Sequence, residues 1–256
     1  MKINKLGSKM SNPHFSISLN PYNKHFTVIT NYLSTIESVY DKAQAEYPRL
    51  AVFRFDLRLP DSVLGLDNPN MPRADLMKRF FASLQSKLKA SFNFRKHIRD
   101  QHLHYVWVKE SGGQKNKDHY HVAVFLNKDD FGISLKSRYS DMVKTQPRMV
   151  RRRAGKDYKS FKECVQEAWA SALNIDNHQG AQQVFFSTTA CRWVTKGSLA
   201  FKDEYISLMA HLSYMAKPQS KQIGVNGRCI GTGAPLIYRA VKRQPKPCLC
   251  ANKYDL

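Results

Sequence analysis

The fold is decided by the stretch Asp118-His119-Tyr120-His121-Val122-Ala123-Val124-Phe125-Leu126, in which a histidine pair is followed by five apolar residues. Successive residues of a β-strand point to opposite faces, so His119 and His121 would stand side by side on one face. The apolar residues that follow favour a buried strand, which would hold both imidazole rings in fixed positions. The stretch therefore predicts a rigid pair of histidines at the start of a core strand.

A second strand-like run, Leu103–Val108, precedes this stretch and is followed closely by Glu110. The residues between, 111–117, are polar and contain two glycines, as expected of a hairpin loop. A hairpin would bring the Glu110 carboxylate beside the imidazoles of His119 and His121. Two imidazoles and one carboxylate form a three-ligand site for a divalent metal ion, with open positions for a substrate.

Periodicity predicts further helices and strands along the chain. Alternating apolar and charged residues predict a strand over 50–59, and residues 183–188 favour a shorter one. Apolar residues at helical spacing predict helices over the ranges 23–46, 73–96, 158–173 and 202–217. We expect the remaining segments to be a loose leader at 1–21, a glycine-rich turn at 224–233 and a last strand at 236–238.

These elements do not alternate as regular strand–helix–strand units, and the hairpin strands are antiparallel. The predicted fold class is therefore α+β, with a central antiparallel β-sheet flanked by helices. We expect the leader and first helix to occupy 1–47, one main domain to occupy 48–240, and a basic tail to occupy 241–256.

A second histidine pair, His102 and His104, competes with the first for the role of metal ligands. No carboxylate precedes it at hairpin distance, and no purely apolar strand follows it, so we favour His119 and His121. Because His104 shares strand parity with Glu110, it could still face the same site.

Asp56 lies between Arg54 and Arg58 on the charged face of the strand expected over 50–59. It could touch a metal ion bound near the histidines. We favour the alternative of an ion pair with the two arginines, because opposite charges on one face of a sheet usually pair.

The composition indicates a nucleic-acid partner. The 256 residues include 41 lysines and arginines against 20 aspartates and glutamates, which gives a formal net charge of +21. Such a surplus favours a polyanion, and we expect Arg148, Arg151, Arg152 and Arg153 to contact phosphate groups. A solvated surface loop is compatible with the same basic run.

Signals for a membrane or an oxidising compartment are absent from the sequence. No apolar run approaches the ~18 residues of a membrane span, and the first residues lack the apolar core of a secretory signal. The five cysteines are odd in number and irregularly spaced, so we expect reduced thiols in the cytoplasm. Cys248 and Cys250 lack a second ligand pair, which argues against a zinc site.

The helix expected over 202–217 carries a candidate nucleophile. Its apolar face consists of Leu208, Met209, Leu212, Met215 and Ala216. Tyr214 and Lys217 lie on the other side at i and i+3, so their side chains are neighbours. An ammonium group beside a phenol stabilises the phenolate, which makes Tyr214 a plausible nucleophile. Tyr205 falls on the apolar face, so a single nucleophilic tyrosine is expected.

Together these motifs resemble the HUH endonucleases. His119-Tyr120-His121 is similar to their histidine–hydrophobic–histidine motif, and Tyr214-Met215-Ala216-Lys217 is similar to their Tyr-x-x-Lys motif. Glu110 occupies the place of the acidic third ligand, and the strand over 50–59 that of the family's first motif. The resemblance spans about residues 50–217 and is greatest to replication initiators of filamentous phages (inoviruses) and related prophage proteins.

The resemblance implies a rolling-circle replication initiator that nicks single-stranded DNA at an origin. Tyr214 would attack a phosphate held by Mg²⁺ or Mn²⁺, leaving a 5′-phosphotyrosine and a free 3′-hydroxyl, and the step could be reversed to rejoin ends. The 3′-hydroxyl would prime a polymerase of the bacterial host in its cytoplasm. The chain contains no Gly-x-x-x-x-Gly-Lys-[Ser/Thr] motif, so unwinding would require a host helicase.

Three other functions remain open at this point. A relaxase or a single-strand transposase would use the same residues, although many relaxases place the tyrosine before the histidines. A non-catalytic DNA-binding regulator would use the basic surface alone. A mononuclear iron oxygenase would also use two histidines and a carboxylate, but it gives no role to the charge or to Tyr214 and Lys217.

Overall fold

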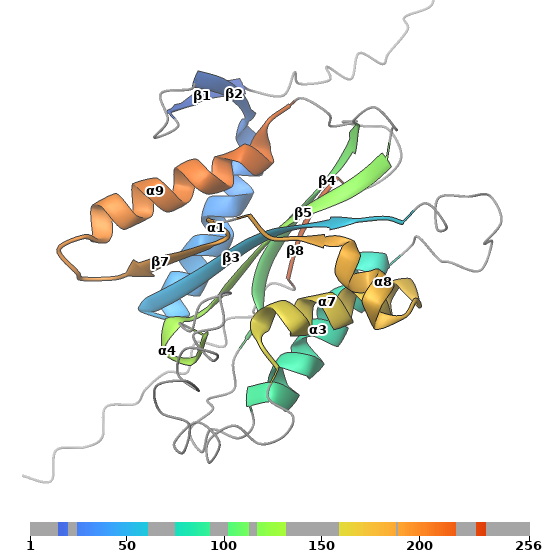
Figure 1. Cartoon of the computed structure of the whole chain (residues 1–256). Coiled ribbons are helices and arrows are strands. Elements are labelled where there is room, and N and C mark those ends of the chain that lie inside the picture. Colours follow the sequence, from blue (N-terminus) through green and yellow to red (C-terminus); the bar gives the residue numbers. More distant parts are fainter. Residues whose placement is uncertain are drawn as a thin grey trace, which may run out of the picture.

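The computed structural model describes residues 15–19, 25–60, 75–92, 102–112, 117–131, 159–187, 189–218 and 229–233. The elements, labelled as in Figure 1, are β1 (Phe15–Leu19), β2 (His25–Ile29), α1 (Thr30–Glu46), β3 (Arg49–Arg58), α3 (Leu76–Phe92), β4 (His104–Gly112), β5 (Lys117–Asn127), α4 (Lys128–Phe131), α7 (Phe161–Leu173), α8 (Asn177–Gln182), β6 (Val184–Phe185), β7 (Cys191–Thr195), α9 (Phe201–Ser213), the 3₁₀ turn η1 (Tyr214–Ala216) and β8 (Ile230–Thr232).

The centre of the molecule is an antiparallel β-sheet with the strand order β6-β3-β5-β4-β8. The strands β6 and β7 both pair with the same edge of β3: β7 pairs with Arg49–Phe53, and β6 pairs with Asp56 and Leu57. The strands β1 and β2 form a separate antiparallel pair. The predicted α+β class, with a central antiparallel sheet flanked by helices, is confirmed.

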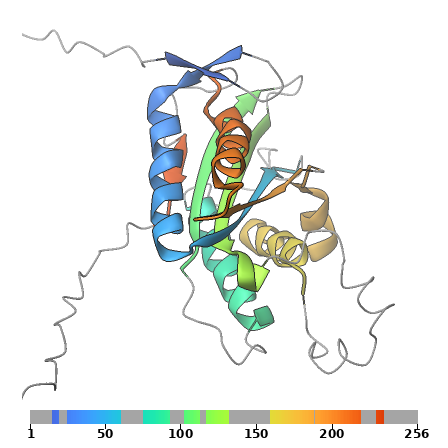
Figure 2. The ribbon, with the colours of Figure 1, turned by 90° about the vertical axis from the view of Figure 1, so that its left-hand side faces the viewer.

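Helices cover both faces of the sheet, and the alternation of residues along β3 explains why. Phe53, Phe55 and Leu57 point to the face covered by α3 and α7. Leu50 and Val52 point to the opposite face, which α1 and α9 cover. Figures 1 and 2 show these helix pairs on the two sides of the sheet.

The strands β4 and β5 form the expected hairpin, with Glu110 paired to His119 across it. The central strand β5 is buried on both faces. Val122 and Val124 join the core under α3 and α7, and Phe125 joins the core under α1 and α9. The apolar run after the histidines therefore anchors the start of β5 from both sides.

The N-terminal segment differs from the prediction. Residues 25–29 form β2 rather than the first turns of a helix, and α1 begins at Thr30. The β-branched run Thr27-Val28-Ile29 explains the difference, because such residues favour strands over helices. Residues 15–19 form β1, where a loose leader was expected.

The segment expected to be a glycine-rich turn includes the edge strand β8, which pairs with Val106–Val108 of β4. A side chain at Gly231 would meet the Trp107 ring at 2.6 Å, so only glycine fits this close approach. The short elements α8 and β7 were not predicted. The expected strand at 236–238, the basic tail and the cysteines Cys248 and Cys250 lie outside the described residues.

Candidate metal centre

The side chains of Glu110, His119 and His121 meet at the hairpin end of the sheet. Oε2 of Glu110 lies 3.2 Å from Nε2 of His121 and 3.6 Å from Nε2 of His119. One ligand atom from each residue lies within 4.8 Å of the other two. Glu110 and His121 are buried, whereas His119 is partly exposed, so the cluster is accessible from one side.

The strand register explains why these residues meet. Glu110 pairs with His119, and Val108 pairs with His121, so all four side chains point to the same face of the sheet. This is the face covered by α1 and α9, because Val108 belongs to the core beneath those helices. The structure thus brings together the three ligands that the sequence predicted.

Asp56 orients the inner histidine. It pairs with His121 across β3 and β5, and Nδ1 of His121 donates a hydrogen bond to Oδ1 of Asp56 at 2.5 Å. The sequence predicts an ion pair between Asp56 and its neighbouring arginines, but the main partner of Asp56 is His121. A carboxylate on the far nitrogen of a metal-binding histidine is a common supporting contact.

The charges around this pair shift the pKa values of both residues. Burial raises the pKa of Asp56, but the hydrogen bond from His121 and the charges of His121 and Arg54 outweigh it, so the pKa is lowered. Burial lowers the pKa of His121, but the carboxylates of Asp56 and Glu110 outweigh it, so the pKa is raised. The two carboxylates therefore favour positive charge at His121, whether it is a proton or a metal ion.

The residues present fit a divalent cation. With Nδ1 donating to Asp56, Nε2 of His121 is the nitrogen that faces the cluster, and it is buried 3.2 Å from Oε2 of Glu110. Two imidazole nitrogens and one carboxylate oxygen converge there, a ligand set that suits a divalent metal ion.

Tyr214 lies against this cluster. Its ring centroid is 5.9 Å from that of His121, and the two rings are nearly perpendicular at 89°. The helix α9 ends at Ser213, and the 3₁₀ turn that follows carries Tyr214 while Met215 and Ala216 are buried beneath it. The buried Met215 and Ala216 therefore fix the position of Tyr214, and this residue remains 41% exposed.

Two cations contact the Tyr214 ring. Nζ of Lys217 lies 4.2 Å from the ring centroid, and Cζ of Arg54 lies 4.7 Å from it. Lys217 has extended backbone just before Pro218, which turns the chain away after η1. The predicted proximity of Tyr214 and Lys217 is present, and Arg54 is an additional cation that sequence reasoning missed.

His211 and Arg192 extend the polar network beneath α9. Burial and the charges of Arg54 and Arg192 lower the pKa of His211 to about 4, so this imidazole is neutral near pH 7. Arg192 donates a hydrogen bond to Oγ of Ser207 at 2.6 Å. The sequence offered one signal for Arg54, its shared strand parity with Asp56, and none for the contacts of His211 or Arg192.

Tyr205 lies away from the cluster. Its ring packs against Tyr40 at 5.1 Å and against Phe201 at 6.5 Å, beside the core under α1 and α9. The helical phase predicted this separation from Tyr214.

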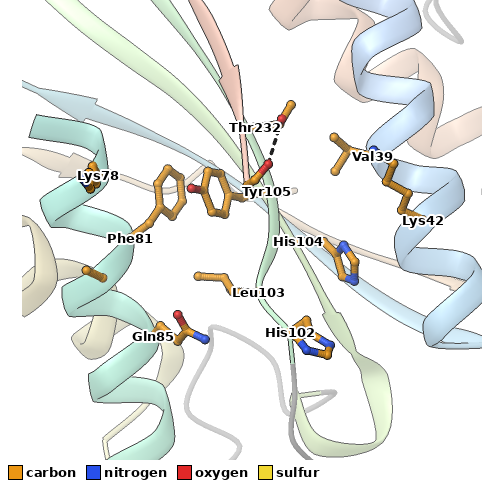
Figure 3. A pocket seen from close by; sticks show the side chains of 12 residues that line it. Val39, Lys42, Lys78, Phe81, Gln85, His102, Leu103, His104, Tyr105 and Thr232 are labelled. Atoms are coloured by element: carbon orange, nitrogen blue, oxygen red, sulfur yellow. Dashed lines mark hydrogen bonds between the residues drawn. The ribbon is translucent and has the colours of Figure 1, made fainter. Parts of the chain in front are cut away.

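The second histidine pair, His102 and His104, lies away from the metal cluster and contacts Glu46. His104 and His102 contact the two carboxylate oxygens of Glu46 at 2.7 and 2.8 Å. The alternative that His104 also faces the metal cluster is wrong, because His104 lies six residues before Glu110 on β4, roughly 20 Å away at ~3.3 Å per residue. The two histidines line a pocket of about 340 Å³ between α1, α3 and the edge of β4, shown in Figure 3.

The chain matches the YagK/YfjJ C-terminal domain family over residues 12–233. It belongs to this family. The chain is similar to the uncharacterized protein YagK of Escherichia coli strain K12, with 28% identity over 217 residues. The aligned region covers 81% of this chain and 94% of YagK. No solved structure matches the chain.

The residues matched by the YagK/YfjJ C-terminal domain family contain every helix and strand described above. They also contain Tyr214 and the cluster of Glu110, His119 and His121. In this family member, no helix of the described segments is long and apolar enough to cross a membrane. The expected phosphate-binding residues Arg148, Arg151, Arg152 and Arg153 lie outside the described residues.

Proposed function

We propose that this protein is a metal-dependent endonuclease that nicks single-stranded DNA through a covalent tyrosine intermediate, as HUH replication initiators do. The observation that carries the proposal is the contact between Tyr214 and His121, which joins an exposed phenol to a cluster of three candidate metal ligands. A formal net charge of +21 supports a nucleic-acid substrate.

Glu110, His119 and His121 would hold the cation, which we expect to be Mg²⁺ or Mn²⁺. When bound there, it would polarise the scissile phosphate and offset the charge that develops on its oxygens. Asp56 would keep Nε2 of His121 directed toward the ligand atoms.

Tyr214 would supply the attacking group. Its hydroxyl oxygen forms a bond to phosphorus while the bond from phosphorus to the 3′ oxygen breaks, so one phosphate ester replaces another. The phenol proton leaves to solvent, and the departing 3′ oxygen takes up a proton. Lys217 and Arg54, at 4.2 and 4.7 Å from the ring, would stabilise the phenolate. The reverse reaction rejoins the ends.

We expect the free 3′-hydroxyl to prime a host polymerase at a replication origin in the bacterial cytoplasm. A host helicase would separate the strands, because the chain has no phosphate-binding Gly-x-x-x-x-Gly-Lys-[Ser/Thr] motif. Rolling-circle initiation of an inovirus-type or prophage replicon is the role most consistent with these expectations.

The test is a covalent adduct. The protein is incubated with Mn²⁺ and labelled single-stranded DNA from its own replicon, and the products are separated on a denaturing gel. We expect Tyr214→Phe to abolish the adduct and the matched control Tyr205→Phe to retain it. An adduct that survives Tyr214→Phe would show that the nucleophile is a different residue.

Two alternatives correspond to other outcomes of the same assay. Cleavage of transposon ends or of a plasmid transfer origin, with none at a replication origin, would indicate a transposase or a relaxase. Binding without cleavage in any metal and on any strand would indicate a DNA-binding regulator.

A further inference from the structure

An exposed aromatic ring lies in line with the metal centre. Phe185 ends the short edge strand β6 and is 51% exposed. It pairs with Asp56 on one side of β3, and His121 pairs with Asp56 on the other side. Paired residues of an antiparallel sheet point to the same face, so Phe185, Asp56 and His121 form one row across three strands.

The spacing of this row suits a single strand of nucleic acid. Adjacent strands lie about 4.8 Å apart, and Phe185 and His121 are two strands apart, so their Cα atoms are roughly 10 Å from each other. A stacked single strand advances roughly 3.4 Å per nucleotide. A phosphate at the metal centre would therefore have a base within about three nucleotides of Phe185, and within fewer if the strand is extended.

A cation accompanies the ring. Cζ of Arg58 lies 5.7 Å from the centroid of the Phe185 ring, and Arg58 pairs with His119 across β3 and β5. The guanidinium thus lies on the same face as the metal ligands and is exposed. An exposed aromatic ring beside an exposed cation is the combination that binds a base and its phosphate in single-strand sites.

We infer that Phe185 is a stacking platform for one nucleobase of a bound DNA single strand, with Arg58 contacting a neighbouring phosphate. This inference rests on the proposed function, because it takes the substrate to be single-stranded DNA that passes the metal centre. It adds a subsite that holds a base near the nick position by stacking, which tolerates any base, rather than by hydrogen bonds.

The chain provides a matched control in Trp193. Trp193 is 37% exposed and belongs to β7, another edge strand paired with β3. Nζ of Lys128 lies 4.5 Å from the centroid of the Trp193 ring. Trp193 pairs with Ala51, whose side chain belongs to the core under α3 and α7, so it points to the face opposite the metal ligands. A strand bound at the metal centre would not reach it.

The test compares two short strands in fluorescence anisotropy: an oligothymidylate of about eight nucleotides, within the usual site size, and an abasic strand of equal length. All variants carry Tyr214→Phe so that no strand is cleaved. Phe185→Ala should weaken oligothymidylate binding about tenfold and leave binding of the abasic strand unchanged. Phe185→Trp should restore the preference, and Trp193→Ala should change neither affinity.

Equal losses on both strands, or no loss on either, would overturn the inference. Arg58→Gln should lower the slope of the log–log salt dependence by about 0.7 on both strands, as expected for one phosphate contact. The readout needs no cleavage, so it is independent of the adduct assay. Absence of an adduct with a retained Phe185 effect would reject nicking and keep the stacking subsite.

Discussion

His121 donates a hydrogen bond through Nδ1 to Oδ1 of Asp56 at 2.5 Å, across the central strands β3 and β5. This contact selects the tautomer that leaves Nε2 facing Glu110, 3.2 Å from Oε2. The candidate metal centre therefore depends on a residue far from its ligands in the sequence. The register of the sheet, rather than proximity in the chain, brings Asp56 to the site.

Replacing Asp56 by Asn should weaken Mn²⁺ binding about 10- to 100-fold, because the charge that orients and polarises His121 is lost. Isothermal titration calorimetry measures the affinity. The matched control is Asp129→Asn, which removes the carboxylate of a surface ion pair with Arg49. Equal Mn²⁺ affinities of the wild type and Asp56→Asn would contradict the supporting role of Asp56.

Loss of a ligand should remove the stabilisation by metal. At about 100 times its Kd, a bound ion adds roughly 2.7 kcal/mol, which corresponds to a rise in Tm of about 5–10 °C for a domain of this size. Glu110→Gln and His119→Ala should lose this Mn²⁺-dependent rise in a thermal melt. His178→Ala, an exposed histidine on α8, should keep it.

The sequence was informative where the determining contacts are local. The hairpin of β4 and β5 and the alternation of its side chains were enough to place Glu110, His119 and His121 together. The helical spacing expected over 202–217 predicted Tyr214 beside Lys217 and away from Tyr205; the contact is present, but α9 ends at Ser213 and Tyr214 lies in the 3₁₀ turn η1. Each of these relations depends on residues that are close together in the sequence.

Contacts between distant segments were beyond the same reasoning. Asp56 could not be assigned to His121 without the register of β3 against β5, so its arginine neighbours were the favoured partners. The contact of Glu46 with His104 joins the end of α1 to the start of β4 across 58 positions of sequence. Strand parity alone could not show that His104 lies at the wrong end of its strand to reach Glu110.

Lys217→Gln should slow formation of the tyrosine–DNA adduct about 100-fold, because the ammonium 4.2 Å from the Tyr214 ring would no longer stabilise the phenolate. Mn²⁺ affinity should be unchanged, since Lys217 is not among the ligands. A time course on a denaturing gel measures the rate. The matched control is Lys202→Gln at the exposed start of α9, and a wild-type rate for Lys217→Gln would remove the lysine from the proposed mechanism.

Glu46 should make the stability of the protein depend on pH in the acid range. Burial raises the pKa of Glu46, but hydrogen bonds from Tyr47, His102 and His104 outweigh it, so the folded-state pKa lies below the ordinary value of 4.5. A carboxyl with a lowered folded-state pKa stabilises the fold fully above its unfolded-state pKa, and the effect disappears as pH falls through the folded-state pKa.

Glu46→Gln should therefore lower the free energy of unfolding by about 1 kcal/mol at about pH 5.5 and by little at about pH 3. Urea denaturation at the two pH values measures the difference. The control is Glu37→Gln on the same helix, because Glu37 has no hydrogen bond or ion pair within the described part of the chain. Glu37→Gln should leave the free energy of unfolding close to that of the wild type. A pH-independent effect of Glu46→Gln would mean that the carboxylate charge does not hold His102 and His104 to the end of α1.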